Sequence, residues 1–187
     1  MGHLILVLGG ARSGKSAYAQ QLAHTQGAER VLFVATAEAR DDDMAQRIAK
    51  HRQSRPASWH TLEAPQHIGA AIQRSRGHIP VVLIDCLTLL VSNVLLSLNL
   101  PLTLETAQRA VTKEVDALLQ VCQASAATFI VVSNEVGLGL VPDTALGRLY
   151  RDLLGQANQT LAANAQAVYF MVAGLAVDVK ALAVRSP

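Results

Sequence analysis

The chain alternates between short apolar runs and longer segments in which apolar and polar residues are mixed. Five apolar runs have the length of a strand and are continuous rather than alternating: 3–8, 30–35, 79–85, 127–133 and 167–173. Continuous runs of this kind are typical of strands that are covered on both faces. The mixed segments predict helices near 15–26, 42–54, 66–76, 87–97, 104–124 and 143–165. For the last helix, Pro142 precedes the N-cap candidate Asp143. This order of elements predicts an α/β fold with a mostly parallel central sheet flanked by helices.

The composition predicts that residues 1–187 form a single domain with a sizeable core. The chain is 51% hydrophobic and 16% charged, which is too apolar for extended disorder. A chain of 187 residues is also long enough to bury a core of its own. The formal net charge of +2 is too small to suggest a nucleic-acid-binding protein, so we expect any basic patch to be local.

The longest apolar stretch, residues 80–102, raises the question of a membrane span. Polar residues and a proline interrupt it, at Asp85, Asn93, Asn99 and Pro101. A buried strand followed by a buried helix fits this pattern better, so we expect no membrane insertion. The two cysteines, Cys86 and Cys122, form no CxxC pair and predict reduced thiols. These features predict a cytoplasmic protein.

The segment GGARSGKS, residues 9–16, follows the first apolar run and fits the G-x-x-x-x-G-K-[ST] pattern of a phosphate-binding loop. The residues concerned are Gly9, Gly10, Ala11, Arg12, Ser13, Gly14, Lys15 and Ser16. The glycines let backbone N–H groups point at a phosphate, and the next helix adds the partial positive charge of its N-terminus. We expect Lys15 to act as a catalytic residue on the β- and γ-phosphates and Ser16 to ligate Mg²⁺. A chance match is the alternative, but the strand before and the helix after favour nucleotide binding.

A carboxylate at the end of a neighbouring strand usually completes such a magnesium site. Asp85 ends the third apolar run, in the Walker B position, and we expect it to act beside Ser16. The alternative is that Asp85 caps the next helix. The segment 133–142 is expected at the same carboxyl edge of the sheet, where open α/β folds bind ligands. Whether its Asn134 and Glu135 contact substrate or order the loop stays open.

The basic segment QRIAKHRQSRP, residues 46–56, contains a histidine among several cations. On a helix one narrow stripe contains Met44, Ile48, His51 and Arg55, with Arg52 at its edge. Because an unpaired arginine in an apolar core is costly, a cleft that holds anionic groups explains this stripe better. Pro56 predicts that the helix ends near Arg55. In such a cleft a neutral imidazole could attack phosphorus while guanidinium groups neutralise the developing charge. A solvated or structural histidine is the alternative.

Several segments together resemble one family, the bifunctional adenosylcobinamide kinase/adenosylcobinamide-phosphate guanylyltransferases of cobalamin biosynthesis. They are LGGARSGKS (8–16), FVATAEARDDDMAQRIAKHRQSRP (33–56), LIDCLTLLVSN (83–93), VVSNEVGLGLVP (131–142) and the stretch from LYRDLL to MVAG (149–174). The resemblance implies a RecA-like P-loop fold and two successive reactions. In the first, ATP or GTP phosphorylates the aminopropanol hydroxyl of adenosylcobinamide. In the second, a histidine attacks the α-phosphate of GTP, and the GMP passes to adenosylcobinamide phosphate to give adenosylcobinamide-GDP.

The resemblance also implies roles for individual residues. The guanylylated histidine of the family lies in an H-[RK]-x-x-R-P block, which here is residues 51–56, so His51 is the implied catalytic histidine. Implied nucleotide contacts outside the phosphate loop are Ala35, Thr36, Ala37, Arg52, Gln53, Ser54, Arg55, Glu63 and Asp85. Some relatives have glutamate at the position of Asp85, which leaves its role open between metal and guanosine. Lys50 stands where some relatives have a second histidine, which favours His51 as the reactive one. Family members form trimers, so a homo-oligomer is implied.

Two other functions are alternatives to the kinase and guanylyltransferase activities. A small-molecule P-loop kinase without a covalent intermediate would leave His51 dispensable. A regulatory NTP-binding module would hydrolyse nucleotide slowly until a partner stimulates it, but the near-neutral charge offers no surface for nucleic acid. Neither alternative needs the histidine and arginine block at residues 51–56.

Overall fold

A computed structural model describes residues 2–39, 42–53, 55–75, 77, 79–99 and 101–184 of the chain, and for residues 43, 44, 47, 50, 51 and 53 only the backbone. The strands are β1 (His3–Gly9), β2 (Val31–Ala35), β3 (His60–Glu63), β4 (Val81–Asp85), β5 (Thr128–Asn134), β6 (Ala167–Val172) and β7 (Leu175–Asp178). The helices are α1 (Lys15–Gly27), α2 (Asp42–Gln53), α3 (Ile68–Arg74), α4 (Leu87–Leu96), α5 (Leu104–Ala124), α6 (Ala145–Asn164) and α7 (Val179–Leu182).

The strands form one seven-stranded sheet in the order β3-β2-β4-β5-β1-β6-β7. All neighbouring strands are parallel except β7, which pairs with β6 in the antiparallel direction. This confirms the α/β class with a mostly parallel central sheet that the sequence predicts, in agreement with a RecA-like P-loop fold. The carboxyl ends of β1, β2, β4 and β5 meet at one edge of the sheet, and the segment 9–16 and Asp85 lie at that edge.

Alternate residues of the central strands pack against opposite layers of helices. Leu4 and Leu6 of β1 belong to a buried cluster that includes residues of α3, α4, α5 and α6. Ile5 and Val7, on the other face of the same strand, belong to a second cluster that includes residues of α1. Because both faces are covered, these strands have the continuous apolar sequences from which they could be predicted.

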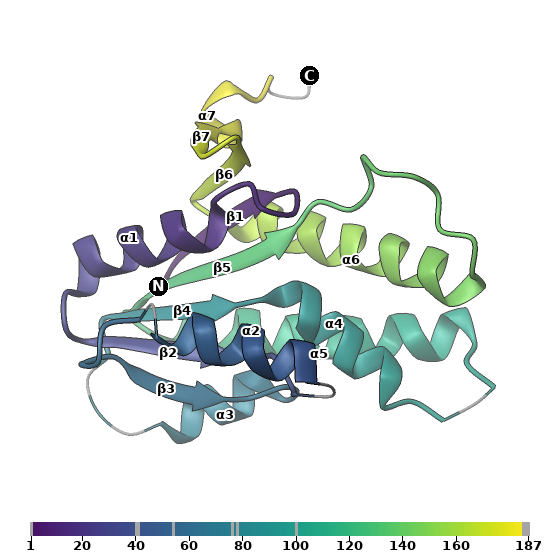
Figure 1. Ribbon diagram of the computed structural model, residues 1–187, viewed down its shortest axis with the longest axis horizontal. Coiled ribbons are helices and arrows are strands. Elements are labelled where there is room, and N and C mark those ends of the chain that lie inside the picture. The colour runs from purple at the N-terminus through teal and green to yellow at the C-terminus, as the bar shows by residue number, and fades with distance from the viewer. Residues whose placement is uncertain are drawn as a thin grey trace.

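The sequence-based prediction was wrong at the two edges of the sheet. Residues 60–63 and 175–178 were not expected to be strands, yet they form β3 and β7. Every residue of β3 and β7 is exposed or half-buried; β3 has the sequence HTLE with no apolar run, and the run in β7, LAVD, is only three residues long, too short to identify a strand. Figure 1 shows β6, β7 and α7 projecting at the top of the view, beyond the rest of the sheet.

The six predicted helices agree with the observed boundaries to within a few residues, whereas α7 was not predicted and one N-cap needs correction. The N-cap of α6 is Thr144, whose hydroxyl accepts the backbone N–H of Gly147 at 3.0 Å, so the prediction of Asp143 was wrong by one position. Among the described residues, none of the helices combines the length and apolar character needed to cross a bilayer. The cytoplasmic location stays a prediction.

Candidate nucleotide-binding site

The loop between β1 and α1 has the backbone geometry of a phosphate cradle. Gly14 is the N-cap of α1 and has φ of 93°, a conformation that favours glycine. A Cβ atom at Gly9 would lie 2.5 Å from Ser13 Oγ and 2.9 Å from the carbonyl oxygen of Met171, so this position has no room for a side chain. The Lys15 ammonium donates to the carbonyl oxygen of Gly10 at 2.9 Å and so spans the loop. Because α1 begins at this loop, the unpaired backbone N–H groups of its first turn are available to bind a phosphate.

Two neighbouring segments hold this loop from outside. The N–H of Gly174, in the turn between β6 and β7, donates to the carbonyl oxygen of Ser13 at 3.0 Å. The N–H of Glu135, after β5, donates to the carbonyl oxygen of Gly9 at 3.2 Å. The phosphate loop is therefore positioned by the β1, β5 and β6 side of the sheet.

Lys15, at the start of α1, and Asp85, at the end of β4, line the same cavity. Burial lowers the pKa of the Lys15 ammonium, while the nearby Cys86 and Asp85 act in the opposite direction. The hypothesis that Asp85 caps α4 was wrong: the N-cap is Cys86, and no side-chain cap is present at this helix in the described residues. Asp85 is the last residue of β4, and its charge acts on both Lys15 and Arg55.

A cavity of about 850 Å³ joins the phosphate loop to the end of α2. Among the residues implicated by the sequence, those that line it are Lys15, Ser16, Ala35, Ala37, Arg52, Arg55, Glu63 and Asp85. Its wall also contains residues that were not predicted from the sequence pattern, namely Glu38, Ala39, Pro65, Cys86, Thr88 and Leu89. Thr88 and Leu89 follow Asp85 closely, so proximity to a strand end could have identified them. Pro65 follows β3, a strand that the sequence did not predict.

The end of α2 contributes a cationic wall to this cavity. Ile48, Arg52 and Arg55 line it, which agrees with the predicted stripe, and α2 ends at Gln53 ahead of Pro56. The Arg55 guanidinium lies 3.5 Å from the centroid of the Phe33 ring, a cation–π contact. Burial lowers the pKa of this half-buried guanidinium. Arg52 Nη1 lies 3.9 Å from Glu63 Oε1 in an exposed pair, so both side chains are accessible to a ligand.

Other residues implicated by the sequence lie off the cavity wall or outside the described residues. Thr36 is fully buried, and its hydroxyl bonds the backbone of Cys86 rather than pointing into the cavity. Gly9, Gly10, Ala11, Arg12, Ser13 and Gly14 form the phosphate loop beside the cavity. The backbone of His51 and Gln53 lies in α2, but their side chains are outside the described residues, as is all of Ser54.

The open question about Asn134 and Glu135 has a different answer for each residue. Asn134 lines the cavity, and its backbone N–H donates to the Thr88 hydroxyl at 2.9 Å. Glu135 Oε1 accepts the N–H of Gly137 at 2.6 Å, which orders the loop after β5. Asn134 is thus placed to contact a ligand, whereas Glu135 shapes its own loop.

The two cysteines are both free thiols. Burial raises the pKa of Cys86 to about 11, so the thiol beside the phosphate loop stays protonated at neutral pH. The described residues contain no group of three histidine, cysteine or acidic side chains arranged to hold a metal ion. Ser16 and Asp85 would thus supply one hydroxyl and one carboxylate, a donor set that fits Mg²⁺ shared with substrate phosphates.

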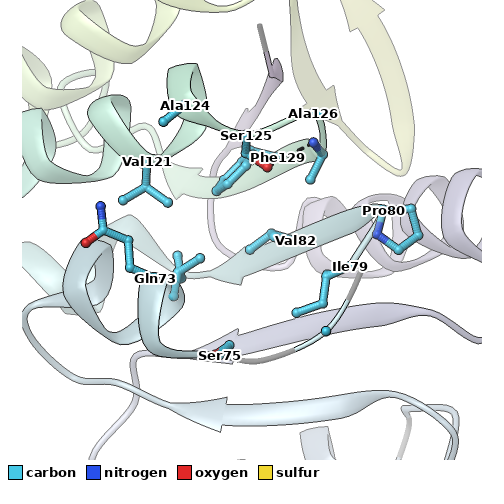
Figure 2. Close-up of a pocket in the computed structure, with 13 residues that line it drawn as sticks. Gln73, Ser75, Ile79, Pro80, Val82, Val121, Ala124, Ser125, Ala126 and Phe129 are labelled. Carbon is cyan, nitrogen blue, oxygen red and sulfur yellow. Dashed lines mark hydrogen bonds between the residues drawn. The ribbon is translucent and has the colours of Figure 1, made fainter.

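A second cavity, of about 420 Å³, lies near the amino ends of β4 and β5, at the opposite edge of the sheet. Figure 2 shows Ile79, Val82 and Phe129 among the apolar side chains that surround it, with Gln73 and Ser125 as polar groups. None of its described lining residues is charged. It therefore lacks the cations and the helix N-terminus that a nucleotide requires.

Comparisons with known proteins agree with the family resemblance. A protein-family model described as cobinamide kinase / cobinamide phosphate guanyltransferase matches residues 5–179. The bifunctional adenosylcobalamin biosynthesis protein CobU of Salmonella typhimurium is 41% identical over 182 residues, which cover 95% of this chain and 99% of the relative. The bifunctional adenosylcobalamin biosynthesis protein CobP of Pseudomonas aeruginosa is 42% identical over 175 residues, which cover 94% of this chain and 96% of the relative.

Two solved structures are distantly similar to this chain. The flagellar accessory protein FlaH from Methanocaldococcus jannaschii has a TM-score of 0.49 at 15% identity, covering 94% of this chain and 76% of that one. The RadB recombinase has a TM-score of 0.49 at 14% identity, covering 90% and 74%. Membership rests instead on the family match and on relatives above 40% identity that align over nearly the whole length. The chain belongs to the cobinamide kinase / cobinamide phosphate guanyltransferase family.

Proposed function

We propose that this protein phosphorylates adenosylcobinamide with ATP or GTP and then transfers GMP from GTP, through a guanylylated histidine, to adenosylcobinamide phosphate. The products of the second reaction are adenosylcobinamide-GDP and pyrophosphate. The observation that supports this best is the cavity in which Lys15 and Asp85 share one space with Arg52 and Arg55. A kinase alone needs the phosphate loop and a metal, whereas guanylyl transfer also needs cations where charge develops on the attacked phosphate.

The phosphoryl-transfer half of the site is assigned to Lys15, Ser16 and Asp85. The ammonium of Lys15 neutralises charge on the β- and γ-phosphates, and N–H groups of the loop hold the same oxygens. Ser16 and Asp85 would hold Mg²⁺, which supplies charge neutralisation between the phosphates when bound. The hydroxyl of adenosylcobinamide then attacks the γ-phosphorus, and the nucleoside diphosphate leaves.

The guanylyl-transfer half is assigned to His51 with Arg52 and Arg55. A ring nitrogen of His51 attacks the α-phosphorus of GTP, an N–P bond forms, the bond to the bridging oxygen breaks, and pyrophosphate leaves. A phosphate oxygen of adenosylcobinamide phosphate then attacks the same phosphorus and releases His51. The position of His51 three residues after Ile48, which lines the cavity, supports this assignment. The two guanidinium groups on this wall stabilise charge on the phosphoryl oxygens.

Labelled GTP tests the covalent step. The protein is incubated with Mg²⁺ and either α-labelled or γ-labelled GTP, and the label bound to protein is measured after treatment with acid and with alkali. We expect an adduct from α-labelled GTP that is stable in alkali and lost in acid, as a phosphoramidate is. We expect no adduct from γ-labelled GTP, and none in His51→Ala.

The matched control is His60→Ala, because His60 lies on β3 with an exposed side chain and no assigned role. It should retain the adduct. Intact nucleotide binding without any adduct from α-labelled GTP in the wild type would exclude guanylyl transfer and leave a simple P-loop kinase. Turnover that requires an added protein partner would favour the regulatory NTP-binding module instead.

We also propose that residues 1–187 act as one catalytic domain and assemble into a homo-oligomer, with a trimer as the state that the family resemblance implies. Support for assembly comes from apolar side chains on the β6, β7 and α7 segment: Leu175 is 71% exposed and Leu182 is 72% exposed. Exposed apolar surface of this kind is typical of protein–protein interfaces. The substrates are small molecules, and the proposed function involves neither nucleic acid nor insertion into a membrane.

A further inference from the structure

Three loops meet beside the α2 side of the cavity, and buried polar groups join them. Thr36, after β2, uses its hydroxyl to accept the N–H of Cys86 and to donate to the carbonyl oxygen of Cys86, each at 2.7 Å. The loop after β4 is thereby tied to the loop after β2. The N–H of Ala64, after β3, donates to the carbonyl oxygen of Ala35 at 2.9 Å.

Asn93, on α4, links the loops after β2 and β3 from behind the cavity. Its side-chain amide donates to the carbonyl oxygen of Thr36 at 2.8 Å and to that of Pro65 at 3.1 Å. The side chain of Gln66 in turn donates to the backbone carbonyl oxygen of Asn93 at 3.1 Å. Asn93 is only 4% exposed and is not among the residues that line the cavity. Any effect that it has on bound substrate must therefore act through the loops that it joins.

The bond from Asn93 to Pro65 leads to the guanylyl-transfer half of the site. The bond to Thr36 leads toward Asp85, but Thr36 also bonds Cys86 and donates its own N–H to the carbonyl oxygen of Asp85 at 3.3 Å, and these contacts hold the loop after β4 without Asn93. Pro65 lines the cavity two residues after Glu63, and Glu63 pairs with Arg52 on α2, the helix that contains His51. The phosphate loop is held from another side, since Gly174 and Glu135 bond it from the β6 and β5 side. A shift of the loop after β3 would move Glu63 and Pro65 while Lys15 kept its bond to Gly10.

We propose that Asn93 is a positioning residue for guanylyl transfer, which fixes the wall formed by Glu63 and Pro65 against the end of α2. The proposal rests on the two-reaction function proposed above. An asparagine suits this position because one NH₂ group supplies two donors, and the two carbonyl groups that it bonds belong to different loops. An aspartate of the same shape would place acceptors against acceptors and separate the loops.

The test compares the two half-reactions in Asn93→Asp. The first measurement is the rate of adduct formation from α-labelled GTP, and the second is the rate at which γ-labelled ATP phosphorylates adenosylcobinamide. We expect the first rate to fall by about tenfold or more, since small displacements of reacting groups have large effects on rate, while the second changes by no more than about twofold. If Asn93→Asp does not fold, Asn93→Ala, which removes the donors without adding charge, is measured in its place.

Gln166→Ala is the control for a general loss of stability. Its side-chain carbonyl accepts the N–H of Leu4 at 2.6 Å, at the opposite edge of the sheet from the cavity. We expect this variant to melt at a lower temperature with an unchanged ratio of the two rates. Equal losses of both rates in the Asn93 variants, or the same change of ratio in Gln166→Ala, would overturn the positioning role. A wild-type protein that forms no adduct would overturn the proposed function itself, which is a separate outcome.

Discussion

At the scale of single residues, Lys15 is the side chain on which phosphoryl transfer most depends. Its ammonium is half-buried, spans the phosphate loop to Gly10, and lies in the field of Asp85. We expect Lys15→Ala to lower the rate of adenosylcobinamide phosphorylation on the order of 100-fold or more, because one preorganised charge at the transferring group is lost. Steady-state kinetics with labelled ATP measures this rate. Lys113→Ala, an exposed lysine on α5, should leave it unchanged, and an unchanged rate in Lys15→Ala would contradict the assignment.

The phosphate loop could be predicted from sequence because one short segment supplies its glycines, its lysine and its serine. The positions of Asn93 and Pro65 could not, because their contacts join residues far apart in the chain: Asn93 bonds Thr36, which precedes it by 57 positions. The helical stripe ending in Arg55 could be predicted in part, since spacing places residues on a face. Spacing does not indicate that the guanidinium rests on the Phe33 ring of a neighbouring strand.

At the scale of elements, two glycines in helices have opposite roles. Gly69 of α3 lies against α5: a Cβ atom there would be 2.7 Å from the backbone oxygen of Ala117. Gly155 of α6 has open space, with nothing within 4 Å of such an atom. We expect Gly69→Ala to reduce the free energy of unfolding by about 1–3 kcal/mol through overpacking. Gly155→Ala should raise it by about 0.5–1 kcal/mol, since alanine is the better helix former.

Urea denaturation followed by circular dichroism measures both changes. Each variant serves as the control for the other, because both make the same substitution inside a helix. Equal effects would show that α3 moves away from α5 at no cost, contrary to the close packing seen between them. The sequence alone could not distinguish the packing of Gly69 from that of Gly155, because each is a glycine within a predicted helix.

The edge strands mark the limit of prediction at this scale. Buried strands such as β4 have the uninterrupted run VVLID and could be recognised. The sequence of β3 is HTLE, and its strand character comes from pairing with β2, from Leu32 opposite His60 to Ala35 opposite Glu63. The pairing that brings Glu63 to the cavity is thus a tertiary effect. The family resemblance implicated Glu63 as a nucleotide contact, but the local pattern did not.

At the scale of the whole molecule, we expect a second copy of the chain to bind the segment formed by β6, β7 and α7. Leu175 and Leu182 are largely exposed on it, and Figure 1 shows it projecting at the top of the view. We expect the wild type to be oligomeric and Leu175→Arg to be monomeric, because a charge in an apolar interface loses its hydration without gaining a partner. Light scattering after gel filtration, over a range of concentrations, measures the mass.

Gln120→Arg is the matched control for that substitution, since it adds the same charge to an exposed position on α5. It should keep the wild-type mass. The turn that precedes Leu175 also holds the phosphate loop, through the bond from Gly174 to Ser13. Loss of assembly should therefore weaken nucleotide binding as well as change the mass, and titration with GTP measures that second effect. A monomeric wild type, or an oligomer that persists in Leu175→Arg, would show that these apolar side chains serve another contact.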